Sequence, residues 1–140
     1  MAHVLVDTGP LVAILDASDH FHDWAVANLK AVQPPLITCE AVLSEVCFLL
    51  RRQPKAFAAI ALLLERKILA IRFSLAQEID PVFGLLARKD VPMSLADGCL
   101  VRLSELNPES LVFTLDHDFQ IYRRHCRQKL LIPATGNLTS

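Results

Sequence analysis

Four acidic residues stand at positions where the surrounding pattern is apolar. Asp7 directly follows the apolar run at residues 4–6, and Asp116 follows the similar run at 111–115. Glu45 and Asp97 lie in stretches with helical periodicity and have apolar residues three and four positions away, which for Glu45 include Phe48 and Leu49. Both acids are therefore expected to lie on an apolar stripe that faces inward. A carboxylate beside an apolar core needs hydrogen-bond donors, an opposite charge or a bound cation. These four acids are therefore the first candidates for chemistry.

Carboxylates gathered at one place repel each other unless protons or cations intervene. Mg²⁺ and Mn²⁺ prefer oxygen ligands and need no histidine or cysteine. A cation held in this way can activate water and stabilise the charge that develops when a phosphodiester is attacked in line. Three or four of these acids thus predict a site that holds one or two divalent cations and catalyses a metal-dependent phosphoryl displacement.

Three of these acids also have a purely structural explanation. A buried ion pair with an arginine would also explain an inward-facing Glu45. Asp97 forms a possible capping box with Ser94, and an acid in the first turn of a helix is favoured by the helix dipole. Asp116 is followed by Asp118, and one of the two could be a turn or N-cap residue. We favour Asp116 for the site because it is nearer the strand end, and we expect Asp118 to be an accessory.

A different phosphoryl chemistry would make Asp7 itself the nucleophile, as in haloacid-dehalogenase-like phosphatases. Those enzymes carry a second aspartate two residues after the first, and here that position is Gly9. The sequence therefore favours a metal ligand over a nucleophile at Asp7.

The elements that must position the acids alternate between strands and helices. Residues 8–10 are expected to form a tight turn before the first helix, and Ser74 with Gln77 a capping box that opens a helix to about residue 89. Strands are predicted at 3–6, 36–38, 68–73, 111–115 and 130–132, and helices at about 11–15, 20–32, 40–52, 55–67, 74–89, 94–106 and 119–126. This order predicts an α/β fold in which a mainly parallel sheet lies between helical layers, with residues 1–140 as a single domain.

Bulk composition narrows the class of protein. The chain is 53% hydrophobic with a formal net charge of -1, so no global basic field indicates nucleic acid. No apolar run approaches the roughly 20 residues that a membrane span requires. The four cysteines form no C-x-x-C pair, which favours free thiols in a reducing compartment over zinc or disulfides. We therefore expect a cytoplasmic protein that does not enter a membrane.

The acids lie in four segments that together resemble the PIN (PilT N-terminus) domain family, and in particular its small VapC-type toxin members. The segments follow the order and rough spacing of the family's motifs and span nearly the whole chain. They are Val-Leu-Val-Asp-Thr-Gly-Pro-Leu-Val at 4–12, Ala-Val-Leu-Ser-Glu-Val at 41–46, Ser-Leu-Ala-Asp-Gly-Cys-Leu at 94–100 and Thr-Leu-Asp-His-Asp-Phe at 114–119.

The resemblance implies a three-layer α/β/α fold and a Mg²⁺- or Mn²⁺-dependent endoribonuclease, often a homodimer. It implies that the toxin members are held inactive by a small antitoxin. The metal-binding acids that it implies are Asp7, Glu45, Asp97 and Asp116. Thr8 and Thr114 match hydroxyl residues that the family keeps beside its acids, and supporting contacts are also predicted for Ser94 and Asp118.

An RNA substrate needs cations near the acids to hold its phosphates. Arg123 and Arg124 are the preferred candidates because they follow Asp116 within one short predicted helix. The other basic clusters, such as Arg51 with Arg52, lie at helix ends where the dipole already favours them.

Two other functions are compatible with the same residues, namely a catalytically silent PIN-like interaction module and a general RNA-processing nuclease without an antitoxin.

Overall fold

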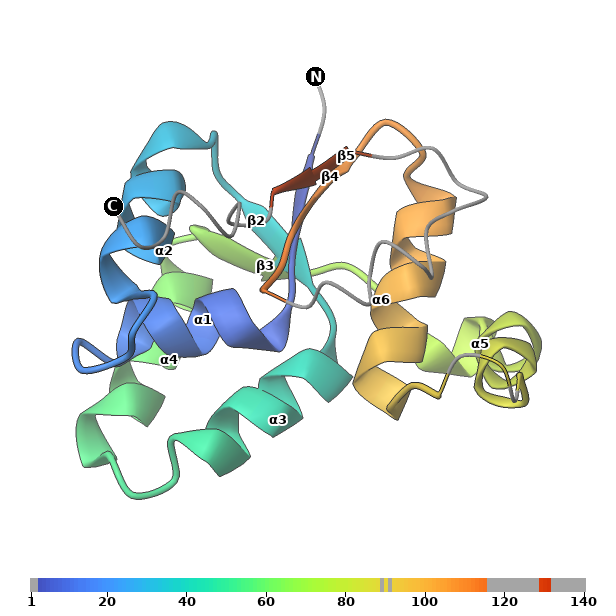
Figure 1. Cartoon of the computed structure of the whole chain (residues 1–140), viewed down its shortest axis with the longest axis horizontal. Coiled ribbons are helices and arrows are strands. Elements are labelled where there is room, and N and C mark those ends of the chain that lie inside the picture. The colour runs from blue at the N-terminus through green and yellow to red at the C-terminus, as the bar shows by residue number, and fades with distance from the viewer. Residues whose placement is uncertain (1–2, 89, 91, 116–128, 132–140) are drawn as a thin grey trace.

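The structure is a computed structural model that describes residues 3–88, 90, 92–115 and 129–131. The strands are β1 (Val4–Val6), β2 (Leu36–Thr38), β3 (Leu69–Ile71), β4 (Leu111–Phe113) and β5 (Lys129–Leu131). The helices are α1 (Thr8–Leu15), α2 (His22–Ala31), α3 (Glu40–Leu49), α4 (Pro54–Glu65), α5 (Ile79–Leu86) and α6 (Leu95–Leu106), with a 3-10 turn η1 at Leu75–Gln77. From β1 to β4 each strand is followed along the chain by a pair of helices before the next strand begins (Figure 1).

The strands form one five-stranded sheet in the order β3-β2-β1-β4-β5. Every neighbouring pair is parallel, so the carboxyl ends of all strands lie at one edge. β1 is the central strand, and Val6 is in register with Phe113 of β4. The predicted parallel sheet is confirmed, and the residues that follow β1 and β4 emerge side by side.

Alternate residues of β1 enter two different cores. Val4 and Val6 belong to the larger apolar cluster, to which α1–α4 contribute most of the helical residues. Leu5 belongs to a second cluster with Leu100 and Leu103 of α6. Figure 1 accordingly shows α1 and α2 on one side of the sheet and α6 on the other. The expected three-layer α/β/α architecture is confirmed.

Two local predictions are wrong. Residues 8–10 do not form a turn, because α1 begins at Thr8 with Asp7 as its N-cap. Ser74 makes no capping hydrogen bond, and a 3-10 turn precedes a separate helix α5 that starts at Ile79. Pro81 explains the second result, since proline has no N–H and is tolerated only in the first turn of a helix. The predicted helix at 119–126 lies outside the described residues.

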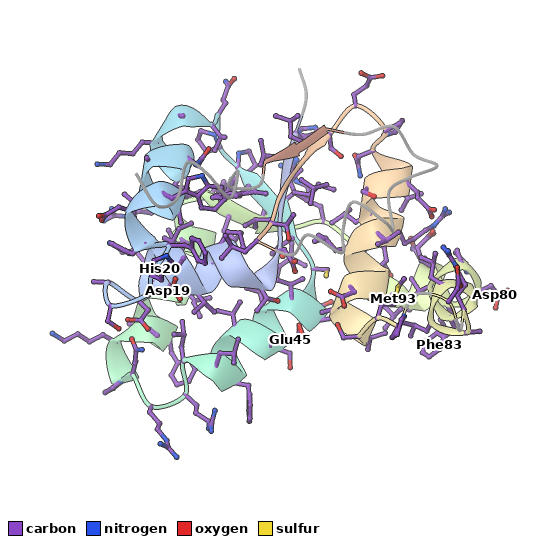
Figure 2. All side chains as sticks on the ribbon, viewed as in Figure 1. Asp19, His20, Glu45, Asp80, Phe83 and Met93 are labelled. Carbon is purple, nitrogen blue, oxygen red and sulfur yellow. The ribbon has the colours of Figure 1, made fainter. Side chains whose placement is uncertain are left out.

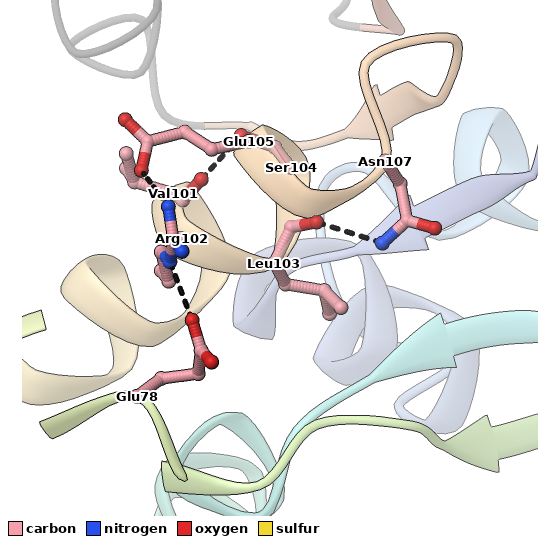
Figure 3. A network of polar contacts seen from close by, with 7 residues as sticks. All are labelled: Glu78, Val101, Arg102, Leu103, Ser104, Glu105 and Asn107. Atoms are coloured by element: carbon pink, nitrogen blue, oxygen red, sulfur yellow. Dashed lines mark hydrogen bonds and ion pairs between the residues drawn. The ribbon is translucent and has the colours of Figure 1, made fainter. Parts of the chain in front are cut away.

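A polar network on α6 ties this helix to the segment before α5 (Figure 3). The Arg102 Nε atom lies 2.7 Å from Glu78 Oε1, and its Nη1 atom lies 3.3 Å from Glu105 Oε1. The hydrogen bond to Glu78 is the main cause of the raised pKa of Arg102. The network thus fixes α6, the helix that carries Asp97 in its first turn.

Across the described residues, no helix combines the length and apolar character needed to cross a membrane.

Candidate active site

Asp7 is a buried carboxylate at the carboxyl end of the central strand. Its side chain is only 6% exposed. The backbone N–H of Thr8 donates to Oδ1 at 2.7 Å, and the hydroxyl of Thr114 donates to Oδ2 at 3.0 Å. Thr114 directly follows β4, so the parallel pairing of β1 with β4 brings the two residues together. Each carboxylate oxygen thus accepts a hydrogen bond, which holds the side chain in one orientation.

The backbone at Asp7 is anchored by both neighbouring strands. The Thr38 hydroxyl, at the end of β2, donates to the Val6 carbonyl at 3.1 Å, and the Asp7 N–H donates to the Phe113 carbonyl at 3.0 Å. Thr38 is fully buried and was not among the predicted site residues. Its signal was a hydroxyl residue at the last position of a buried strand, and Thr114 lies one residue beyond the end of β4.

Thr8 connects Asp7 to Glu45. Its N–H donates to the Asp7 carboxylate, and its hydroxyl donates to Glu45 Oε2 on α3 at 3.2 Å. Figure 2 shows Glu45 on α3, and this helix packs against both α1 and α6. Hydrogen bonds of Thr8 therefore join Asp7, Thr8 and Glu45, and Thr114 is joined to them through Asp7. All four are predicted site residues.

The orientation predicted for Glu45 is wrong. Phe48 and Leu49, expected to share an inward-facing stripe with it, are 61% and 56% exposed. The buried stripe of α3 consists of Val42 and Val46, followed by Leu50. Glu45 is half-buried at the edge of this stripe and faces the first turn of α1. No arginine in the described part of the chain forms an ion pair with it.

Ser94 and Asp97 form the predicted capping box at the start of α6. The Asp97 N–H donates to Ser94 Oγ at 3.1 Å, and the Ser94 N–H donates to Asp97 Oδ2 at 3.0 Å. A pocket of about 270 Å³ separates this helix start from α3, and its lining includes both Ser94 and Glu45. The Glu45 side chain and the cap of α6 thus border the same space.

Two buried cysteines lie close to each other, and one of them, Cys39, lies close enough to Asp7 to feel its charge. Cys39 and Cys99 are both buried, and both are free thiols. Burial raises the pKa of Cys39 to about 12, with a smaller contribution from the charge of Asp7. Burial also raises the pKa of Cys99. Burial thus favours the neutral thiol at both cysteines.

The donors that do converge are oxygen atoms of Asp7, Glu45 and threonine hydroxyls, the chemistry that suits a hard divalent cation. Among the residues described, no three or more His, Cys, Asp or Glu side chains lie close enough to share a metal ion. The remaining predicted residues lie outside the described part of the chain: Asp116, Asp118, Arg123 and Arg124.

Comparisons with known proteins agree with this architecture. No curated protein matches the sequence. The crystal structure of the Mycobacterium tuberculosis toxin VapC20, described as cleaving the Sarcin-Ricin loop, has a similar fold with a TM-score of 0.73. Its sequence is 21% identical, and the match covers 84% of this chain and 93% of that one. The sequence model of the PIN domain matches residues 4–124, so the chain belongs to the PIN domain family.

Proposed function

We propose that this protein is an endoribonuclease that depends on Mg²⁺ or Mn²⁺ and hydrolyses RNA phosphodiester bonds. The observation that carries the proposal is the position of Asp7, a buried carboxylate at the carboxyl edge of a parallel sheet that Thr8 connects to Glu45. Membership of the PIN domain family and the fold similarity to a toxin described as cleaving the Sarcin-Ricin loop support it.

In this proposal Asp7, Glu45, Asp97 and Asp116 hold the metal. A divalent cation there would offset the charge of the acids, polarise the phosphate and lower the pKa of water. Thr114 and Thr8 hold the Asp7 carboxylate in place, and the Thr8 hydroxyl restrains Glu45. Arg123 and Arg124 bind the phosphates of the RNA. No side chain has to act as a nucleophile.

We further propose that the chain is one domain and the toxin of a type II toxin-antitoxin pair, acting as a homodimer in the cytoplasm. VapC20, a toxin with the same fold, supports this biological role. A short reading frame beside the gene, encoding a DNA-binding antitoxin, is the expected finding. A gene neighbourhood without one would favour a general RNA-processing nuclease.

The activity is tested with single-stranded RNA in the presence of Mn²⁺. Wild type should cleave the RNA and Asp7→Asn should not, because the amide removes one negative charge from the metal site. Asp23→Asn is the matched control, since Asp23 is an exposed acid in the first turn of α2, and it should cleave like wild type. Equal cleavage by wild type and Asp7→Asn would contradict the proposal and indicate a contaminating nuclease.

Metal binding is tested separately by thermal unfolding. A ligand that binds only the folded state stabilises it by mass action, by about 2.7 kcal/mol at a concentration 100 times its Kd. Mg²⁺ or Mn²⁺ should raise the Tm of wild type but not that of the double variant Asp7→Asn with Asp97→Asn. An equal shift in both proteins would refute the metal site.

A further inference from the structure

Helix α3 presents two large apolar side chains to solvent beside the candidate active site. Phe48 and Leu49 are 61% and 56% exposed. Together with Thr8, Ser44 and Glu45 they line a pocket of about 350 Å³. Since Thr8 and Glu45 are hydrogen-bonded to each other and belong to the acid site, this pocket opens directly beside it.

A cation lies over the Phe48 ring. The guanidinium carbon of Arg51 is 4.1 Å from the ring centroid, and Arg51 Nη1 donates to the Phe48 carbonyl at 2.8 Å. The second contact ties the guanidinium to the same turn of the chain as the ring. This arrangement forms a small platform of an aromatic ring and a planar cation, of the kind on which bases stack.

The charge around the platform favours an anionic ligand. Arg51, Arg52 and Lys55 are all exposed where α3 passes into α4. Of these cations, Arg51 lies over the Phe48 ring, and Phe48 shares the lining of the pocket with Glu45 of the candidate site. A phosphate backbone that runs from the acids toward these cations would bring a base next to Phe48.

We propose that Phe48, supported by Arg51, stacks against an unpaired base of single-stranded RNA whose phosphodiester lies at the acids around Asp7. The inference rests on the proposed ribonuclease function and adds a subsite to it. A single strand is required because bases in a duplex are stacked on one another and offer no free face.

The test measures RNA binding to the Asp7→Asn variant in Mg²⁺, so that the RNA stays intact. The probe is a fluorescein-labelled single-stranded oligoribonucleotide of about 10 nucleotides, followed by fluorescence anisotropy. Adding Phe48→Ala should raise the Kd by about tenfold or more, while Phe48→Tyr, which keeps the ring, should bind like the parent. Phe83→Ala is the matched control, because Phe83 is 50% exposed on α5 and lies well away from Glu45 (Figure 2). It should leave the Kd unchanged.

An oligonucleotide with abasic sites identifies the stacking interaction itself. If Phe48 contacts a base, the abasic probe should bind the parent and Phe48→Ala about equally. An unchanged Kd for Phe48→Ala with the intact probe would overturn the inference. If Phe48→Ala instead lowers the mass of the particle in solution and leaves RNA binding intact, the surface is a protein interface and the inference is wrong.

The inference and the proposed function fail in different ways. Cleavage by wild type but not by Asp7→Asn, with no effect of Phe48→Ala on binding, would refute the base subsite alone. If wild type neither binds nor cleaves single-stranded RNA, both are refuted.

Discussion

The hydroxyl of Thr114 donates a 3.0 Å hydrogen bond to the carboxylate of Asp7, joining two buried residues 107 positions apart in the sequence. Each residue directly follows a strand, and the two strands are parallel neighbours in register. A charged acceptor that is almost excluded from water depends strongly on the donors that it retains. This contact therefore connects the stability of the fold to the orientation of the proposed metal ligand.

Replacing Thr114 by valine should destabilise the protein. Valine keeps the shape of the side chain but cannot donate to Asp7, and a hydrogen bond to a charged group contributes about 1.5–3 kcal/mol. The free energy of unfolding, measured with urea without divalent metal, should fall by that order. Thr114→Ser keeps the hydroxyl and should lose less. Equal stability of Thr114→Val and wild type would show that the contact contributes nothing.

Gly9→Ala tests how tightly the first turn of α1 packs against the chain beyond β4. A Cβ atom at Gly9 would lie 3.1 Å from Leu115 Cδ1 and 3.2 Å from Leu115 Cβ. Alanine is favoured over glycine in a helix by about 1 kcal/mol, but overpacking costs about 1–3 kcal/mol. We expect a net loss of about 1 kcal/mol in urea unfolding.

The Leu115→Ala background provides the control for this prediction. Truncation of Leu115 removes the nearest atom, so the cost of Gly9→Ala should shrink there. The difference between the two backgrounds is the coupling energy of the pair. Alanine keeps the Leu115 Cβ atom, so if both backgrounds give the same cost, the Leu115 Cδ1 atom is not the cause.

Ser94→Ala and Asp97→Asn should separate capping from metal binding. Both variants disrupt the capping box at the start of α6, and loss of an N-cap costs about 0.5–2 kcal/mol, so both should unfold at a lower temperature without metal. Only Asp97→Asn also removes a proposed metal ligand. Added Mn²⁺ should therefore still raise the Tm of Ser94→Ala, and should raise that of Asp97→Asn much less. Equal shifts in the two variants would assign Asp97 a capping role alone.

Cys39 should make the protein less stable in alkali. Burial raises its pKa from 9.0 to about 12, so the folded state keeps a proton that the unfolded state loses. Below pH 9.0 both states hold the proton, and the stability is fully present. As the pH rises from 9.0 toward about 12, only the unfolded state loses the proton, and stability is lost. In that range this group should lower the free energy of unfolding by up to about 1.4 kcal/mol per pH unit. Cys39→Ala should show a shallower alkaline slope in urea unfolding, and an unchanged slope would contradict the effect of burial.

Much of this architecture follows from the sequence alone. Uninterrupted apolar runs such as Val4–Val6 occur where both faces of a strand are buried, so they predict a parallel sheet between helices. The position of Asp7 at the end of the first strand and the capping box of Ser94 and Asp97 were also predictable, because both depend on residues close by in the chain. Local signals of this kind need no knowledge of the neighbouring elements.

The tertiary structure decided the features that depend on distant packing. Phe48 and Leu49 have the same apolar character as Val42 and Val46, and periodicity could not show which pair faces solvent. That choice depends on how α3 packs against α1 and α6, and it determines where Glu45 points. The contacts of Thr114 with Asp7 and of Thr38 with Val6 exist only because strands remote in sequence become parallel neighbours.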